Sequence, residues 1–217
     1  MIELYYFPTP NCLKITLFLE ETGLPYRVTP IDIRTGGQFN PIFQAVSPNS
    51  RIPAITDHAP IDGGKSISIF ESGAILLYLA EKTGKFLPAD GVGRIEVIQW
   101  LFWQMAGLGP MAGQSGHFRR AAPQQIPYAL QRYADETARL YGVLDRRLAD
   151  RPFIAGGAYS IADMASYPWI DAHEGLGQSL GDLPYLSAWL ESIRARPATV
   201  RAIETAMSMR KELSAAN

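Results

Sequence analysis

The sequence has only one cysteine, Cys12, among its 217 residues, so it can form neither an intrachain disulfide nor a cysteine-rich metal site. The absence of disulfides is typical of a protein that works in a reducing compartment. Histidine is also scarce, and His58, His117 and His173 lack the spacing of metal ligands. We therefore expect no metal ion in this protein.

An excess of either charge is missing as well, because 20 basic residues face 21 acidic ones and leave a net charge of −1. Such a balance argues against electrostatic steering toward nucleic acid or a membrane surface. No apolar run is long enough to span a bilayer, and Met1–Leu4 lacks the basic region of a signal peptide. We expect a cytoplasmic protein without nucleic-acid or membrane partners, whose charged ligands are bound by local groups.

The length and the 47% apolar content suit a globular protein of two domains. The segment 85–93 is rich in proline and glycine and poor in apolar residues, which is typical of a linker. Strand patterns occur only before this segment, and helical spacing dominates after it. We predict an α/β domain at 1–84, a linker at 85–93 and an all-α domain at 94–217.

The first domain begins with a β-branched and aromatic run, Ile2–Phe7, which predicts a strand. Asn11 can cap a helix that extends from Cys12 to about Thr22 and ends at Gly23. A second strand, Tyr26–Ile33, follows after a short turn. This β-helix-β order implies a right-handed parallel crossover.

A hairpin is predicted next, from Ile52–Ile55 and Ser66–Phe70 with Gly63-Gly64 in its turn. The nearly uniform apolar stretch from Ala74 to Ala80 predicts a buried helix that ends at Gly84. Together with the crossover, this order is βαβ followed by ββα, the thioredoxin-like topology.

In the second domain, helical spacing predicts helices over 94–114, 127–150 and 184–196. Ser160–Asp163 reads Ser-x-x-Asp and predicts a capping box at the start of a further helix, as a folding element rather than a site. The last residues, Met209–Asn217, are expected to be frayed.

The helix predicted after Phe70 has a first turn suited to a zwitterionic ligand. Free N–H groups and the helix dipole favour an anion there, and Ser72 can add a hydroxyl. Glu71 beside it would hold an ammonium, so the pair fits the end of an amino acid or a γ-glutamyl group. A cis peptide at Ile52-Pro53 would leave the Ile52 backbone free to pair with an extended ligand. The alternative is an ordinary hairpin with a glutamate that complements the dipole.

Ile52-Pro53, the segment Phe70–Ile75 (FESGAI) and the segment Tyr5–Asn11 (YYFPTPN) together resemble the cytosolic glutathione transferases. More narrowly, the chain is similar to the bacterial Nu-class glutathione-dependent disulfide-bond oxidoreductases, which are related to the fungal prion-forming nitrogen regulator. The similarity extends from Ile2 to about Ala198. In the related sequences a glycine stands at the position of Cys12.

The resemblance implies a homodimer that uses glutathione as co-substrate, without a metal, to reduce disulfides and also organic peroxides. It assigns the sulfur contacts to Thr9 and Asn11, and an Arg132 contact to the partner subunit. The remaining glutathione contacts that it implies are Gln38, Arg51, Ile52, Glu71 and Ser72, with Asn11 shared. Gln38 lies in the glycine-rich segment 34–40, which is either a ligand rim or a plain flexible connection.

A thioredoxin-like domain that does its own thiol chemistry uses a Cys-x-x-Cys pair, whereas this chain reads Thr9-Pro10-Asn11-Cys12 at that position. At least one thiol must therefore come from a ligand, for which glutathione is the natural candidate. The helix dipole, the Asn11 amide and the Thr9 hydroxyl could stabilise its thiolate. Cys12 is either a small buried hydrophobe or a second reactive thiol.

Two other functions remain open on the sequence. The aromatic segment from Trp100 to Met111, with its Gly-Leu-Gly-Pro break, is either core or an acceptor pocket for conjugation of glutathione to electrophiles. A regulatory glutathione-binding protein without turnover is the third possibility. No Asn/Gln-rich tract of the prion-forming kind supports it.

Overall fold

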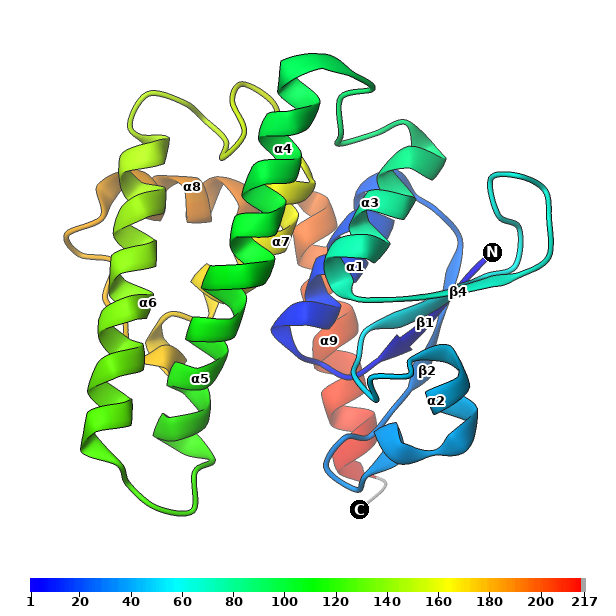
Figure 1. Cartoon of the computed structure of the whole chain (residues 1–217), viewed down its shortest axis with the longest axis horizontal. Coiled ribbons are helices and arrows are strands. Elements are labelled where there is room, and N and C mark those ends of the chain that lie inside the picture. Colours follow the sequence, from blue (N-terminus) through cyan, green and yellow to red (C-terminus); the bar gives the residue numbers. More distant parts are fainter. Residues whose placement is uncertain (216–217) are drawn as a thin grey trace. The chain divides into compact units, whose positions relative to one another are not determined.

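The computed structural model describes residues 1–215 and divides them into two compact units. One unit comprises Met1–Leu87 together with the described residues from Ala195 on, and the other comprises Pro88–Arg194 (Figure 1). The sequence placed the residues after 194 in the helical domain, whereas here they belong with the sheet. The expected linker at 85–93 stays a prediction.

The first unit is built on a four-stranded sheet of order β2-β1-β3-β4. Its strands are β1 (Ile2–Tyr6), β2 (Tyr26–Pro30), β3 (Ala54–Asp57) and β4 (Ile67–Phe70). β1 pairs parallel with β2 and antiparallel with β3, which pairs antiparallel with β4. The predicted βαβ-ββα order is confirmed.

Three long helices complete this unit: α1 (Pro10–Thr22), α3 (Ser72–Thr83) and α9 (Pro197–Ala215). α1 packs against both α3 and α9. Gly23 and Gly84 end the first two helices in the left-handed conformation, as the sequence predicted. The predicted cap is wrong, because Thr9 is the N-cap and Asn11 lies inside the first turn. Pro10 supplies a preset φ at the first helical position, which moves the start forward.

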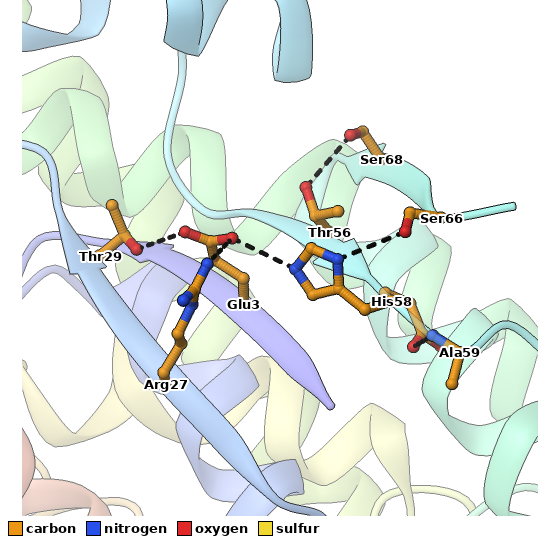
Figure 2. A network of polar contacts seen from close by, with 9 residues as sticks. Glu3, Arg27, Thr29, Thr56, His58, Ala59, Ser66 and Ser68 are labelled. Carbon is orange, nitrogen blue, oxygen red and sulfur yellow. Dashed lines mark hydrogen bonds and ion pairs between the residues drawn. The ribbon is translucent and has the colours of Figure 1, made fainter.

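The sheet has one apolar and one polar face, as alternation along β1 requires. Ile2, Leu4 and Tyr6 are buried in the core. On the opposite face Figure 2 shows a polar network in which Glu3 accepts hydrogen bonds from Arg27 and Thr29 and contacts His58. Burial raises the pKa of Glu3, but these polar contacts outweigh it and hold that pKa below its usual value.

The segment between β2 and β3 contains two short helices that the sequence analysis did not predict, η1 (Gly37–Phe39) and α2 (Pro41–Val46). A signal for α2 was present, because Asn40 precedes a proline at the first helical position. The Asn40 side chain accepts a hydrogen bond from the Ile42 N–H at 2.9 Å. The segment is therefore ordered by its own capping rather than being a plain flexible connection.

α9 corrects the expectation that residues from Met209 on are frayed, since the helix continues to Ala215; the last two residues lie outside the described chain. Arg196 pairs with Glu21, and Arg201 pairs with Glu20 at 2.7 Å. Both acidic partners lie in the last turns of α1. Tertiary contact with α1 thus stabilises a helix whose sequence alone looks weak.

The second unit is helical. It contains α4 (Gly91–Trp103), the π-helical turn η2 (Gln104–Leu108), α5 (Gly109–Arg120), α6 (Pro127–Leu148), α7 (Ile161–Asp171), the short η3 (Glu174–Leu176) and α8 (Pro184–Arg194). The single helix expected over 94–114 is thus interrupted at Gln104–Leu108, which overlaps the Gly-Leu-Gly-Pro sequence only at its first two residues. Among the described helices, none combines the length and the apolar character that a membrane span requires.

The capping box at the start of α7 is confirmed. Ser160 accepts a hydrogen bond from the Ala162 N–H at 3.3 Å, and the buried Asp163 carboxylate accepts one from the Ser160 N–H at 3.0 Å. Asp163 also accepts bonds from the Ile154 N–H and the Trp189 indole, so it ties α7 to α8 and to the preceding loop. Burial raises the pKa of Asp163 to about 6 against these donors.

We predict that Asp163→Ala destabilises the protein more than Ser160→Ala. The serine change removes one cap, worth about 1 kcal/mol. The aspartate change leaves several buried donors unpaired at about 1–3 kcal/mol each, so a loss above about 2 kcal/mol is expected. Urea unfolding of both variants measures this, with the exposed Asp150→Ala as control. Equal losses for the two box residues would contradict the assignment.

Candidate functional site

Four segments meet at one edge of the sheet because of the strand register. Tyr6 pairs with Pro30, Tyr5 with Ala54, and Ala54 with Phe70. The chain continues beyond this edge at Phe7–Asn11, at 31–40, before Ala54 at Arg51–Pro53, and at Glu71-Ser72. Every candidate residue of the first unit lies in one of these segments. Residues spread over more than sixty positions of sequence are therefore brought to a single edge of the fold.

The turn from β4 into α3 is the most unusual part of this edge. Glu71 has φ +69°, in the left-handed region that glycine favours, and its side chain is exposed. Such backbone strain in a non-glycine residue often marks a functional site. Ser72 is the first residue of α3 and is buried, so its N–H lies at the helix start, where the helix dipole favours an anion.

Lys14 on α1 lies behind this helix start and was not singled out from the sequence. It is fully buried, and its ammonium donates a hydrogen bond to Ser72 Oγ at 3.2 Å. Burial lowers the pKa of Lys14 to about 7, although the Glu71 carboxylate favours the charged form. The signal was a lone lysine within the otherwise largely apolar run Leu13–Leu19.

The start of β3 forms the second side of the site. The predicted cis peptide between Ile52 and Pro53 is present. Ser47, which is buried, donates a hydrogen bond to the Arg51 carbonyl at 2.8 Å and holds this approach to the strand. The Arg51 side chain is exposed, so it can reach a ligand at the rim.

The segment 31–40 forms a third side. The Ile31 N–H bonds to the Tyr6 carbonyl at 2.9 Å, which attaches the segment to the end of β1. A Cβ at Gly37 would lie 2.9 Å from the Asp32 carbonyl oxygen, so only glycine fits there. Gln38 follows in η1, and its Oε1 is buried without a hydrogen-bond partner among the described residues. An unpaired buried acceptor is consistent with a ligand contact.

The start of α1 forms the fourth side of the site and contains both Asn11 and Cys12. Asn11 is half-buried in the first turn, where helix N–H groups point outward. Cys12 is fully buried, and burial raises the pKa of its thiol to about 12. A thiol that stays protonated is a poor nucleophile. The structure therefore favours Cys12 as a core residue.

Arg132 belongs to the second unit, on α6, where its side chain is exposed and lies 3.9 Å from Glu136. Its expected contribution from a partner subunit stays a prediction. Among the described residues, no group of three or more histidine, cysteine, aspartate or glutamate side chains could hold a metal ion.

Comparison with protein families matches both units of the chain. The model for the glutathione S-transferase N-terminal domain matches residues 9–82, and the model for the C-terminal domain matches residues 119–197. The disulfide-bond oxidoreductase YfcG of Escherichia coli is 56% identical over 94% of both chains. Disulfide-bond oxidoreductase YghU of the same organism is 42% identical over 92% of this chain and 73% of its own.

Solved structures agree with the family matches. A glutathione transferase family member from Pseudomonas fluorescens with two bound glutathiones aligns with a TM-score of 0.88 and 43% identity, covering 94% of this chain and 92% of that one. A glutathione transferase from Pseudomonas putida with bound glutathione disulfide aligns at 0.86 and 38% identity, covering 93% and 90%. With both of its units matched in sequence and in structure, this chain belongs to the glutathione S-transferase family.

Proposed function

We propose that this protein reduces disulfides with glutathione as co-substrate. One observation carries the proposal: the sheet edge provides two helix starts suited to anions, but its own cysteine is buried and stays protonated. A reactive sulfur at this edge must then come from the ligand. Two relatives named disulfide-bond oxidoreductases, at 56% and 42% identity, support disulfides as the substrate class.

In the proposed pose the γ-glutamyl end of glutathione lies at the start of α3. Its carboxylate accepts bonds from the Ser72 N–H and hydroxyl, and its ammonium meets Glu71. The Ile52 backbone pairs with the cysteinyl backbone, while Gln38 and Arg51 contact the rest of the tripeptide. These roles agree with the position of all five residues at one edge of the sheet.

The glutathione sulfur would then lie over the start of α1, where Asn11 and Thr9 are placed to stabilise a thiolate. This thiolate attacks one sulfur of the disulfide, a mixed disulfide forms, and the other sulfur leaves as a thiolate that takes up a proton. A second glutathione thiolate attacks the glutathione sulfur of the mixed disulfide. The second product thiol leaves, and glutathione disulfide remains.

We further propose a homodimer in which Arg132 reaches the site of the partner subunit. Both units expose large apolar side chains, with Ile67 and Phe70 on β4, and Val92 and Ile95 on α4. β4 is an edge strand, and an exposed apolar edge normally requires cover. Organic peroxide reduction and a cytoplasmic location remain expectations from the sequence.

Two alanine variants at adjacent positions, Asn11→Ala and Cys12→Ala, test which thiol reacts. Loss of a donor to the thiolate costs about 1.5–3 kcal/mol, so Asn11→Ala should reduce the rate of disulfide reduction about tenfold or more. Cys12→Ala should keep most of the activity. The assay uses glutathione with hydroxyethyl disulfide, and chlorodinitrobenzene in parallel to detect conjugation.

Each alternative function has its own outcome in this assay. If the Cys12→Ala variant is inactive and mass spectrometry detects a protein–glutathione mixed disulfide in the wild type, the reactive thiol is that of Cys12 and not that of glutathione. Turnover of chlorodinitrobenzene alone would favour a conjugating transferase. Binding without turnover of either substrate would favour a regulatory protein.

Glu71→Gln tests the ammonium contact at the start of α3. The side chain is exposed, so loss of a charge-assisted bond should cost about 1.5 kcal/mol, which is about a tenfold weaker glutathione affinity. Isothermal titration calorimetry measures the affinity, and circular dichroism checks the fold. An unchanged affinity in a folded variant would exclude Glu71 from the site.

The dimer is tested in solution. Small-angle scattering at micromolar concentration should give the mass of two chains, and Arg132→Ala should weaken glutathione binding without changing that mass. An exposed arginine on the same helix, Arg139→Ala, is the matched control. A monomer under these conditions would contradict the proposal.

A further inference from the structure

Arg34, in the segment 31–40, has no part in the proposed reaction although it contacts three parts of the first unit. Its guanidinium lies over the ring of Phe7, 5.5 Å from the ring centre, and its Nη2 donates a hydrogen bond to the Leu213 carbonyl at 3.0 Å. It also pairs with Asp32, to which it donates at 2.9 and 2.7 Å. One side chain therefore joins the approach to α1, the segment itself and the end of α9.

We propose that Arg34 is a positioning residue, which holds this segment in the conformation that brings the Gln38 side chain to bound glutathione. The inference rests on the proposed glutathione site and deepens it by naming the group that fixes one of its ligand contacts. The Gln38 Oε1 atom is buried and has no hydrogen-bond partner among the described residues, so it suits an amide N–H of the tripeptide. Arg34 acts through Gln38 and does not touch the ligand.

The hydrogen bonds of Asp32 transmit the position of Arg34 to Gln38. The Asp32 carboxylate accepts the two guanidinium bonds and also the Arg34 N–H, at 2.9 Å. Its carbonyl accepts the Gly37 N–H at 2.9 Å, and a Cβ at Gly37 would lie 2.9 Å from that same oxygen. Gln38 is the next residue along the chain. A shift of Asp32 therefore displaces Gly37 and, with it, Gln38.

The shape of the guanidinium allows Arg34 to make these contacts together. A guanidinium has five N–H donors in one plane, so it can pair with a carboxylate through two of them while its face lies on an aromatic ring. A further N–H then remains for the Leu213 carbonyl. A lysine ammonium has the same charge but no such plane. The contacts therefore depend on the arginine fork and not on the charge alone.

The α9 end of this connection is firmly anchored. Leu213 lies in the last turn of α9, where the helix dipole favours a cation. α9 is itself attached to α1 by the ion pairs that its arginines form with Glu20 and Glu21. α1 contains Asn11, one of the proposed sulfur ligands. The connection therefore fixes the segment 31–40 relative to the helix that would hold the sulfur.

The test measures the glutathione affinity of three variants by calorimetry. Arg34→Met should bind glutathione about fivefold more weakly than wild type, because the released segment must be ordered at each binding event. Arg34→Lys keeps the charge without the planar fork and should lose nearly as much affinity. Arg27→Met removes an arginine of similar exposure that pairs with Glu3, and it should keep the wild-type affinity.

A double-mutant cycle with Gln38→Ala tests whether Arg34 acts through Gln38. Without the glutamine side chain, the position of the segment matters less to the ligand. Arg34→Met in this background should therefore weaken binding by less than about twofold. A direct contact between Arg34 and glutathione, or a general loss of structure, would instead give equal losses in both backgrounds.

Steady-state kinetics with hydroxyethyl disulfide give a second readout. In Arg34→Met the KM for glutathione should rise about fivefold, while kcat at saturating glutathione stays within about twofold of wild type. The reason is that the residues proposed to hold the sulfur are unchanged. A fall in kcat without a change in KM would contradict a positioning role in binding.

The outcomes separate this inference from the proposed function. Wild-type affinity in Arg34→Met, full recovery in Arg34→Lys, or equal losses in the cycle would overturn the role of Arg34 alone. A wild-type protein that does not bind glutathione would overturn both. Binding without turnover would overturn the proposed reaction, and the calorimetric cycle would still decide on Arg34. Circular dichroism checks each fold, and if Arg34→Met does not fold, Arg34→Lys replaces it in the cycle.

Discussion

The antiparallel pairing of β3 with both β1 and β4 is the constraint on which the candidate site depends. Because β2 runs parallel to β1, the carboxyl ends of β1, β2 and β4 share an edge with the start of β3. The helices that follow β1 and β4 must then start at this same edge. Because a helix start favours an anion, two helix starts at one edge of the sheet suit a ligand with two anionic centres, a carboxylate and a thiolate.

Burial shifts the pKa values of the two ionisable side chains behind these helix starts in opposite directions. It disfavours charge in both cases, so it raises the pKa of the Cys12 thiol to about 12 and lowers that of the Lys14 ammonium to about 7. The first effect removes the protein's own thiol from the chemistry.

The site also combines rigid and strained elements. The segment from Gly37 to Asn40 is held by a close backbone approach and a helix cap, and Arg51 is held by its bond from Ser47. Glu71 departs into the left-handed region, at the residue that faces the proposed ammonium. Because this edge is preorganised, the protein loses less conformational entropy when it binds a flexible tripeptide ligand.

The sequence by itself determined the element order, the caps at Gly23, Gly84 and Ser160, and the positions of Glu71 and Ser72, because these depend on local φ/ψ preferences and short-range hydrogen bonds. The N-cap of α1 was predicted at Asn11 but lies at Thr9, because Pro10 occupies the first helical position. The sequence analysis also missed α2, although Asn40 signalled it. Tertiary structure decided the rest. α9 is helical to Ala215 because α1 supports it, and Cys12 and Lys14 have shifted pKa values because distant elements exclude water from them. Burial depends on which segments meet in space, and the spacing of residues along one chain does not contain that information.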